Sequence, residues 1–192
     1  DRSLTVEETK TLVHWIEAGA PRGEGDDPLK QTKVSSSVWA NEHELGPPDF
    51  VVDIPSTDIP ATGVVDYKYQ YVKNNLGKDV WVKATEFLPG DRAVLHHVIT
   101  SFGPTETRGP RKGKLKFKDR KGLRGYAPGI NSNPFPDSSG IFLPANVTFE
   151  FQMHYTPIGK ATVDSTKMGI WVADDKPKHE IRSMILLNPR IR

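Results

Sequence analysis

The sequence predicts a mainly β protein, an antiparallel sandwich or jelly roll with one N-terminal helix. After residue 48 the chain consists of short segments in which apolar and polar residues alternate. No helical period returns after residue 20. Glycine and proline account for 16 residues each of 192, which favours many short elements joined by turns over long helices.

The helix is predicted at residues 3–21. Thr5 and Glu8 have the spacing of a capping box, and the apolar residues that follow lie largely on one stripe. Gly19 and Pro21 then end the helix. An isolated helix of this length is marginal in water, so its apolar stripe needs a partner.

Three parts follow from the composition: a helix at 1–21, a linker at 22–48 rich in Gly, Pro and Ser, and a β domain at 49–192. Eight strands are predicted in the β domain, at 50–54, 66–72, 79–87, 94–102, 114–117, 147–155, 167–173 and 181–187. Residues 127–139 carry three prolines and have little capacity to form a sheet.

Composition excludes several classes of function. The net charge is only +2, which argues against a dedicated nucleic-acid binder. The chain has no cysteine, so it cannot form a disulfide, a thiolate-ligated metal site or a covalent c-type haem. No apolar run approaches the ~18 residues of a membrane helix.

One stretch is strongly basic. Residues 108–124 hold nine Lys or Arg and a single acid. A solvated hairpin or loop is the simplest interpretation, and an anionic partner or a neighbouring domain is the alternative. The residues assigned to this basic patch are Arg111, Lys112, Lys114, Lys116, Lys118, Arg120 and Lys121.

Of the six histidines, His14 lies beside Trp15 on the predicted helix, His43 lies in the linker and His179 in a predicted turn, and none of the three is expected to bind a ligand. His96 and His97 differ because they interrupt an apolar strand, AVLHHVI, where unpaired imidazoles carry a desolvation cost. Successive strand residues point to opposite faces, so one buried and one exposed histidine is the default. Both can reach one ion only at a bulge, a strand end or a twisted edge.

His154 lies in a second strand, FEFQMHYTP, on the polar face with Glu150 and Gln152. Together with His96 and His97 it can form a site made only of imidazoles. Such a site suits copper or zinc, and copper(II) is favoured by intrinsic affinity. Structural histidines in a binding module are the alternative.

Four segments carry a resemblance to a known family: LPGDRAVLHHVI (88–99), GYAPG (125–129), FLPAN (142–146) and FEFQMHYTPIGK (149–160). They resemble copper type II, ascorbate-dependent monooxygenases of the peptidylglycine α-hydroxylating type. The resemblance is to the N-terminal domain of the catalytic core, in a bacterial multidomain version, and it covers about residues 49–192.

The resemblance implies a jelly-roll sandwich that binds one copper ion through His96, His97 and His154. This copper would donate electrons after reduction by ascorbate or another external donor. Gln152 matches a residue near that site, and no catalytic residue is assigned. In the family a second copper lies on a following domain with an H-x-H pair, which this sequence lacks. We therefore expect an electron-transfer half-site that hydroxylates nothing by itself.

Residues 1–21 resemble the last helix of bacterial c-type cytochrome domains. The expected partners are thus an upstream cytochrome-like domain and a downstream second copper domain, with no haem bound here. The resemblance to copper enzymes of this kind implies a periplasmic or extracellular location. The alternative is a non-catalytic jelly-roll module with structural histidines and a basic docking loop.

Overall fold

The structure is a computed structural model that describes residues 3–25, 39–130 and 133–183. The chain divides into two compact units, one within residues 1–36 and the other within residues 37–192. The second unit carries all of the strands and is mainly β.

The first unit contains helix α1 (Val6–Glu17), shorter than predicted at both ends. The capping box is confirmed, because the Thr5 side chain accepts from the Glu8 amide at 3.2 Å and the Glu8 carboxylate accepts from the Thr5 amide at 2.8 Å. No residue of α1 is buried, and Leu12, Trp15 and Ile16 all expose their side chains.

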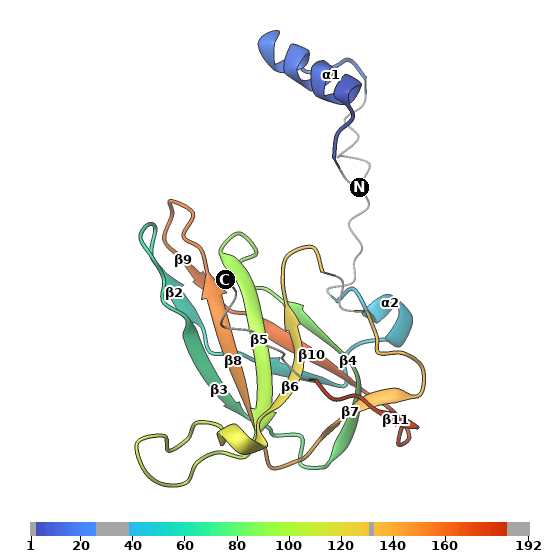
Figure 1. The fold of residues 1–192 in the computed structure, drawn as a ribbon, viewed down its shortest axis with the longest axis vertical. Coiled ribbons are helices and arrows are strands. Elements are labelled where there is room, and N and C mark those ends of the chain that lie inside the picture. Colours follow the sequence, from blue (N-terminus) through green and yellow to red (C-terminus); the bar gives the residue numbers. More distant parts are fainter. Residues whose placement is uncertain (1–2, 26–38, 131–132, 184–192) are drawn as a thin grey trace, which may run out of the picture. The chain divides into compact units, whose positions relative to one another are not determined.

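The second unit has two larger sheets and one small one (Figure 1). The five-stranded sheet has the order β1 (Phe50–Asp53), β10 (Lys167–Val172), β4 (Val80–Leu88), β7 (Ser139–Leu143) and β11 (His179–Glu180). The four-stranded sheet has the order β3 (Lys68–Lys73), β8 (Thr148–Tyr155), β5 (Leu95–Gly103) and β6 (Lys121–Tyr126). A separate pair joins β2 (Thr57–Ile59) to β9 (Thr162–Asp164). All of these pairings are antiparallel except that of β11 with β7.

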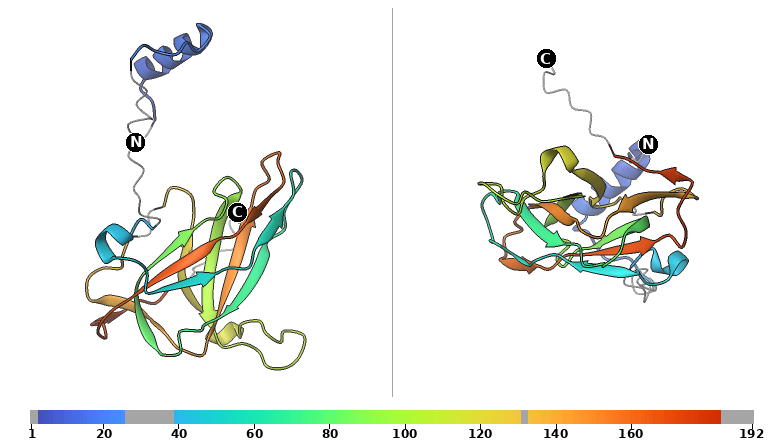
Figure 2. Two further views of the ribbon diagram at one scale, coloured as in Figure 1. Left: turned by 180° about the vertical axis from the view of Figure 1, so that it is seen from behind. Right: turned by 90° about the horizontal axis from the view of Figure 1, so that it is seen from below.

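The two larger sheets enclose the core, so the unit is β-sandwich-like, and the two layers are visible from below (Figure 2). Phe87 of β4 meets Phe151 of β8 edge to face, with ring centroids 6.2 Å apart. Both sheets bury apolar residues completely, among them Val82, Phe149, Met153, Met168 and Ile170. Along β8, Phe149, Phe151 and Met153 face the core, whereas Glu150, Gln152 and His154 lie on the outer face.

Part of the predicted linker belongs to the second unit. Trp39 is buried and meets Trp171 of β10 edge to face at 6.1 Å. Helix α2 (Glu42–Leu45) follows directly, and the Trp171 indole donates to the carbonyl oxygen of Gly46 at 2.9 Å. Composition alone could not reveal this packing, because one buried tryptophan anchors an otherwise polar segment.

Two predicted strands differ from the structure. The strand expected at 114–117 is a loop, in which Leu115 makes one isolated bridge before the 3-10 helix η2 (Phe117–Asp119). Its alternating lysines imitate the pattern of a strand. The strand expected at 181–187 is not seen at 181–183, and the rest lies outside the described residues. The short strands β2, β6, β7 and β9 were not predicted, since three residues, or segments containing glycine, give little periodicity.

Gly90 provides a test of the packing between two turns. A methyl group at this position would lie 2.3 Å from the Ser165 amide nitrogen, which belongs to the backbone and cannot rotate away. Gly90→Ala should therefore lower the free energy of unfolding by about 1–3 kcal/mol, as overpacking does. Thermal melts would measure this, with Gly23→Ala as control because a methyl there meets no atom within 4 Å. Equal melting temperatures in native protein and Gly90→Ala would contradict the packing.

Candidate metal centre

The outer face of the four-stranded sheet brings together the histidines of two neighbouring strands. In the pairing of β5 with β8, His97 lies directly opposite His154. The register shifts between Leu95 and His97, which marks a bulge or irregularity at His96. This irregularity removes the strict alternation that would send His96 and His97 to opposite faces.

The three imidazole rings form one cluster. The ring centroids of His97 and His154 lie 3.8 Å apart, and those of His96 and His97 lie 4.8 Å apart. The Nδ1 atoms of His96 and His97 are separated by 2.8 Å, within hydrogen-bond distance. His96 is exposed and His97 is half-buried, so one edge of the cluster is open to solvent.

His154 is the most deeply placed of the three, with 9% of its surface exposed. Its Nε2 atom is buried and has no hydrogen-bond partner in the described structure. Leaving a buried polar atom unpaired costs about 1–3 kcal/mol, which a bound ion would offset. This orphaned nitrogen is the observation that most directly points to a ligand.

Tyr67 covers His154 from the side of β3. The two rings stack with centroids 3.7 Å apart and planes inclined by 17°, and 58% of Tyr67 remains exposed. Sequence reasoning missed Tyr67, although the alternation in DYKYQYV places it on one face with Tyr69 and Tyr71. Only the register of β3 on β8 identifies that face as the one carrying His154.

The electrostatics of the cluster favour neutral imidazoles. Burial, followed by repulsion from His96, lowers the pKa of His97 below its ordinary value. Burial, followed by repulsion from His97 and His96, lowers the pKa of His154 as well. Because metals bind the neutral imidazole, these shifts keep both side chains in the binding form at neutral pH.

As the side chains stand, no group of three or more His, Cys, Asp or Glu among the described residues is arranged to hold a metal ion. Two nitrogens bound tetrahedrally to one ion at about 2.0–2.1 Å would lie about 3.3 Å apart. The His96 and His97 Nδ1 atoms, at 2.8 Å, are somewhat closer than this. The chemistry of the donor set, three imidazoles with an orphaned nitrogen on His154, is of the kind that copper or zinc accepts.

Gln152 is the remaining residue that the sequence predicts near the site. Gln152 is on the same outer face, but it donates to the Tyr69 hydroxyl and pairs across the sheet with Tyr69 and Ile99. The other three histidines are each exposed on a separate element: His14 on α1, His43 on α2 and His179 on β11.

The basic stretch forms a folded loop rather than an open one. Bridges join Thr105 to Leu115 and Glu106 to Lys112, and Leu115 is buried. Arg120 anchors the loop by an ion pair with the buried Glu150 at 2.5 Å.

Glu150 lies on the same outer face as the histidines, four residues before His154 in β8. Burial and a hydrogen bond to Glu150 raise the pKa of the adjacent Tyr71 to about 12. The face therefore carries a second polar group, held between Tyr71 and Arg120.

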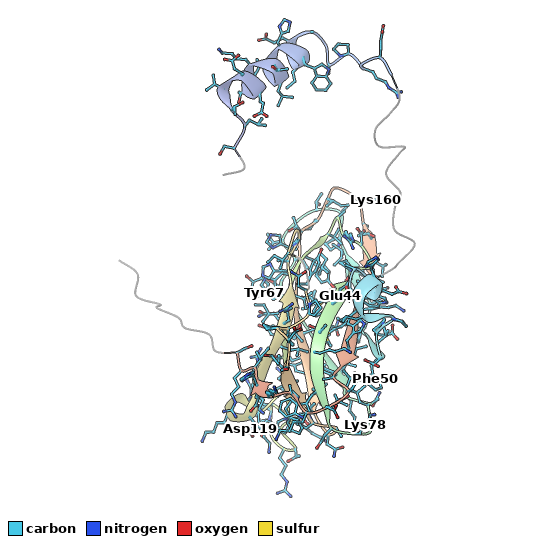
Figure 3. All side chains as sticks on the ribbon, turned by 90° about the vertical axis from the view of Figure 1, so that its right-hand side faces the viewer. Glu44, Phe50, Tyr67, Lys78, Asp119 and Lys160 are labelled. Carbon is cyan, nitrogen blue, oxygen red and sulfur yellow. The ribbon has the colours of Figure 1, made fainter. Side chains whose placement is uncertain are left out.

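The basic patch and the histidines lie at opposite ends of this face. His96 lies seven residues before Gly103, where β5 ends and the loop starts, a span of about 23 Å at the usual rise per residue. Figure 3 shows Tyr67 and Asp119 on the same side of the unit, with Asp119 near its lower end. All patch residues are exposed except the half-buried Lys116.

A scan against protein-family models finds none that matches this chain, and a search of curated proteins also finds no match. Within the described residues, no helix has the length and apolar character needed to cross a membrane.

The lowered pKa values predict a pH dependence of stability in the metal-free protein. In the unfolded chain, His97 and His154 bind protons below about pH 6.5, the ordinary pKa of histidine. In the folded chain, their lowered pKa values mean that they bind protons only at a lower pH. Stability should thus be full above about pH 6.5 and fall as the pH drops through the lowered values. Urea unfolding at pH 7.5, 6.5 and 5.5 measures the free energy of unfolding. Between the highest and the lowest pH, that free energy should fall less in His154→Asn than in native protein. Equal losses in the two proteins would contradict the assignment.

Proposed function

We propose that this chain is the copper-binding, electron-transferring half of a copper-dependent monooxygenase core, built on a jelly-roll sandwich. The observation that supports the proposal best is the buried, unpartnered Nε2 of His154 beside the rings of His97 and His96. Three imidazoles from two adjacent strands form a nitrogen-only donor set, which copper accepts in both of its common oxidation states.

The bound ion would supply one-electron redox chemistry, and the protein's residues supply the rest. His96, His97 and His154 would hold the ion, and the pairing of β5 with β8 would limit how far the ligands can rearrange. Tyr67 shields one face of His154 from water. The exposed edge of His96 leaves a path by which an external reductant can approach.

Oxygen-dependent hydroxylation would require a second copper site outside this chain. The family resemblance of residues 49–192 suggests that such a site lies on a downstream domain, and that of residues 1–21 suggests an upstream cytochrome-like domain. Both the partner domains and the periplasmic or extracellular location rest on this resemblance.

Loss of His154 tests the proposal. His154→Ala leaves two imidazoles from one strand and removes the only ligand contributed by β8. An ion that binds only the native state raises stability by RT ln(1 + [L]/Kd), so native protein should melt at a higher temperature with copper. The variant should lose most of that shift, with copper affinity lower by at least about 10–100-fold.

The control is His179→Ala, which removes an exposed imidazole on β11. It should keep the full copper-dependent shift. An equal shift in native protein and His154→Ala would place the ion elsewhere and refute the proposal.

The basic patch supports a second candidate function, docking of an acidic partner. The folded loop presents its cations together at one end of the sheet, and such contacts weaken as salt screens them. A fluorescent Asp-rich peptide should bind at low salt, and the triple variant Lys112→Gln, Lys114→Gln, Lys118→Gln should lose that binding. The matched control replaces three exposed lysines elsewhere, Lys68, Lys78 and Lys160. If the control loses as much affinity as the patch variant, the patch is not a docking surface.

A further inference from the structure

A buried carboxylate is linked by hydrogen bonds to the segments that adjoin the histidines. Asp164, at the end of β9, is only 1% exposed, yet neither sequence pattern nor family resemblance singles it out. Its two oxygens accept three hydrogen bonds from three different places in the chain. Two of the donors adjoin the histidines: Asp91 lies in the turn before His96, and Tyr155 directly follows His154.

The first bond holds the turn before β5. The Asp91 amide donates to Asp164 Oδ1 at 2.9 Å. The Asp91 carbonyl in turn accepts from the amides of Val94 at 3.3 Å and Leu95 at 3.2 Å. Leu95 immediately precedes His96, so Asp164 is connected through one turn to the start of the histidine pair.

The second bond holds the end of β8. The Tyr155 hydroxyl donates to Asp164 Oδ2 at 2.9 Å, and Tyr155 immediately follows His154. Tyr155 also pairs with Leu95 across the two strands. A third bond, from the Thr166 hydroxyl at 2.7 Å, fixes the carboxylate itself.

Further contacts clamp the same turn against the β9 region. The Thr162 hydroxyl donates to the Asp91 carboxylate at 2.8 Å. Gly90 approaches Ser165 so closely that no side chain fits between them. The turn at 90–95 therefore packs against the segment 162–166. Asp164 accepts hydrogen bonds both from this turn and from Tyr155 at the end of β8.

We infer that Asp164 is the positioning residue of the histidine cluster, since it ties the turn leading to His96 and His97 to the residue that follows His154. Where these rings act as copper ligands, which rests on the proposed function, Asp164 sets their mutual position without touching them. Charge-assisted hydrogen bonds such as these are about twice as strong as neutral ones, which suits a residue that fixes two segments at once.

The chain offers a matched control in Glu86. This carboxylate is also buried, 8% exposed, and accepts from the Ala40 amide at 2.7 Å and from the amide and side chain of Asn41 at 2.9 Å each. It thus makes the same number of bonds as Asp164, but to the segment before α2. Losing Glu86 should destabilise the fold without disturbing β5 or β8 near the histidines.

The experiment compares Asp164→Ala and Asp164→Asn with Glu86→Ala, each titrated with copper(II) and examined by electron paramagnetic resonance. Removing groups that orient metal ligands typically costs 10–100-fold in affinity, so Asp164→Ala should bind copper about that much more weakly and give an altered spectrum. Asp164→Asn keeps the shape and one acceptor oxygen and should recover part of the affinity. Glu86→Ala should lower the melting temperature yet keep native affinity and spectrum.

Two further measurements separate the possible failures. If Asp164→Ala does not fold, Tyr155→Phe can take its place. This variant removes one of the three hydrogen bonds and should weaken copper binding by a smaller factor. In metal-free protein, the imidazole NMR signals of His97 and His154 should move in Asp164→Asn and stay in Glu86→Gln. Native copper affinity and unmoved imidazole signals in Asp164→Asn would overturn this inference. Native protein that binds no copper, but whose imidazole signals still depend on Asp164, would overturn only the proposed function.

Discussion

The candidate site depends on one constraint, the register of β5 against β8. That register sets His97 opposite His154, and the irregularity after Leu95 lets His96 join them. A slip of one residue would turn every side chain of β5 to the other face and separate the rings. The core prevents such a slip, because Phe149 and Phe151 on β8, and Phe102 on β5, are buried between the two sheets. Packing of the sandwich therefore decides the geometry of the polar face.

Local sequence signals predicted the parts that depend on local physics. The capping box at Thr5 and the alternation along 147–155 lie within short windows, and both appear in the structure. His96 and His97 stood out because they interrupt an apolar strand, and His154 because it lies on the polar face of another. Tyr67 and Asp164 could not be found this way, since each meets its partner only through strand pairing or a turn far away in sequence. Trp39 was missed for the same reason, as its partner Trp171 is distant in the chain.

The outer face of the four-stranded sheet carries the imidazole cluster at one end and the anchor of the basic loop at the other. At one end, burial and repulsion from the neighbouring imidazoles lower the pKa values of His97 and His154. At the other end, Glu150 is buried beneath Arg120 and Tyr71, where it fixes the basic loop to the sheet. Glu150 lies four residues before His154 on β8, about 13 Å at the usual rise per residue, so exposed charge on the loop is largely screened from the histidines at physiological salt. A partner docked on the loop alone would not contact the cluster.

The central claim is that three imidazoles from two strands share one copper ion. Pulsed electron paramagnetic resonance of copper(II)-loaded protein, compared with protein labelled with ¹⁵N at histidine, counts the bound imidazoles directly. We expect one copper per chain with three histidine nitrogens, falling to two in His154→Ala. A spectrum with one histidine nitrogen or none, or one unchanged in that variant, would contradict it.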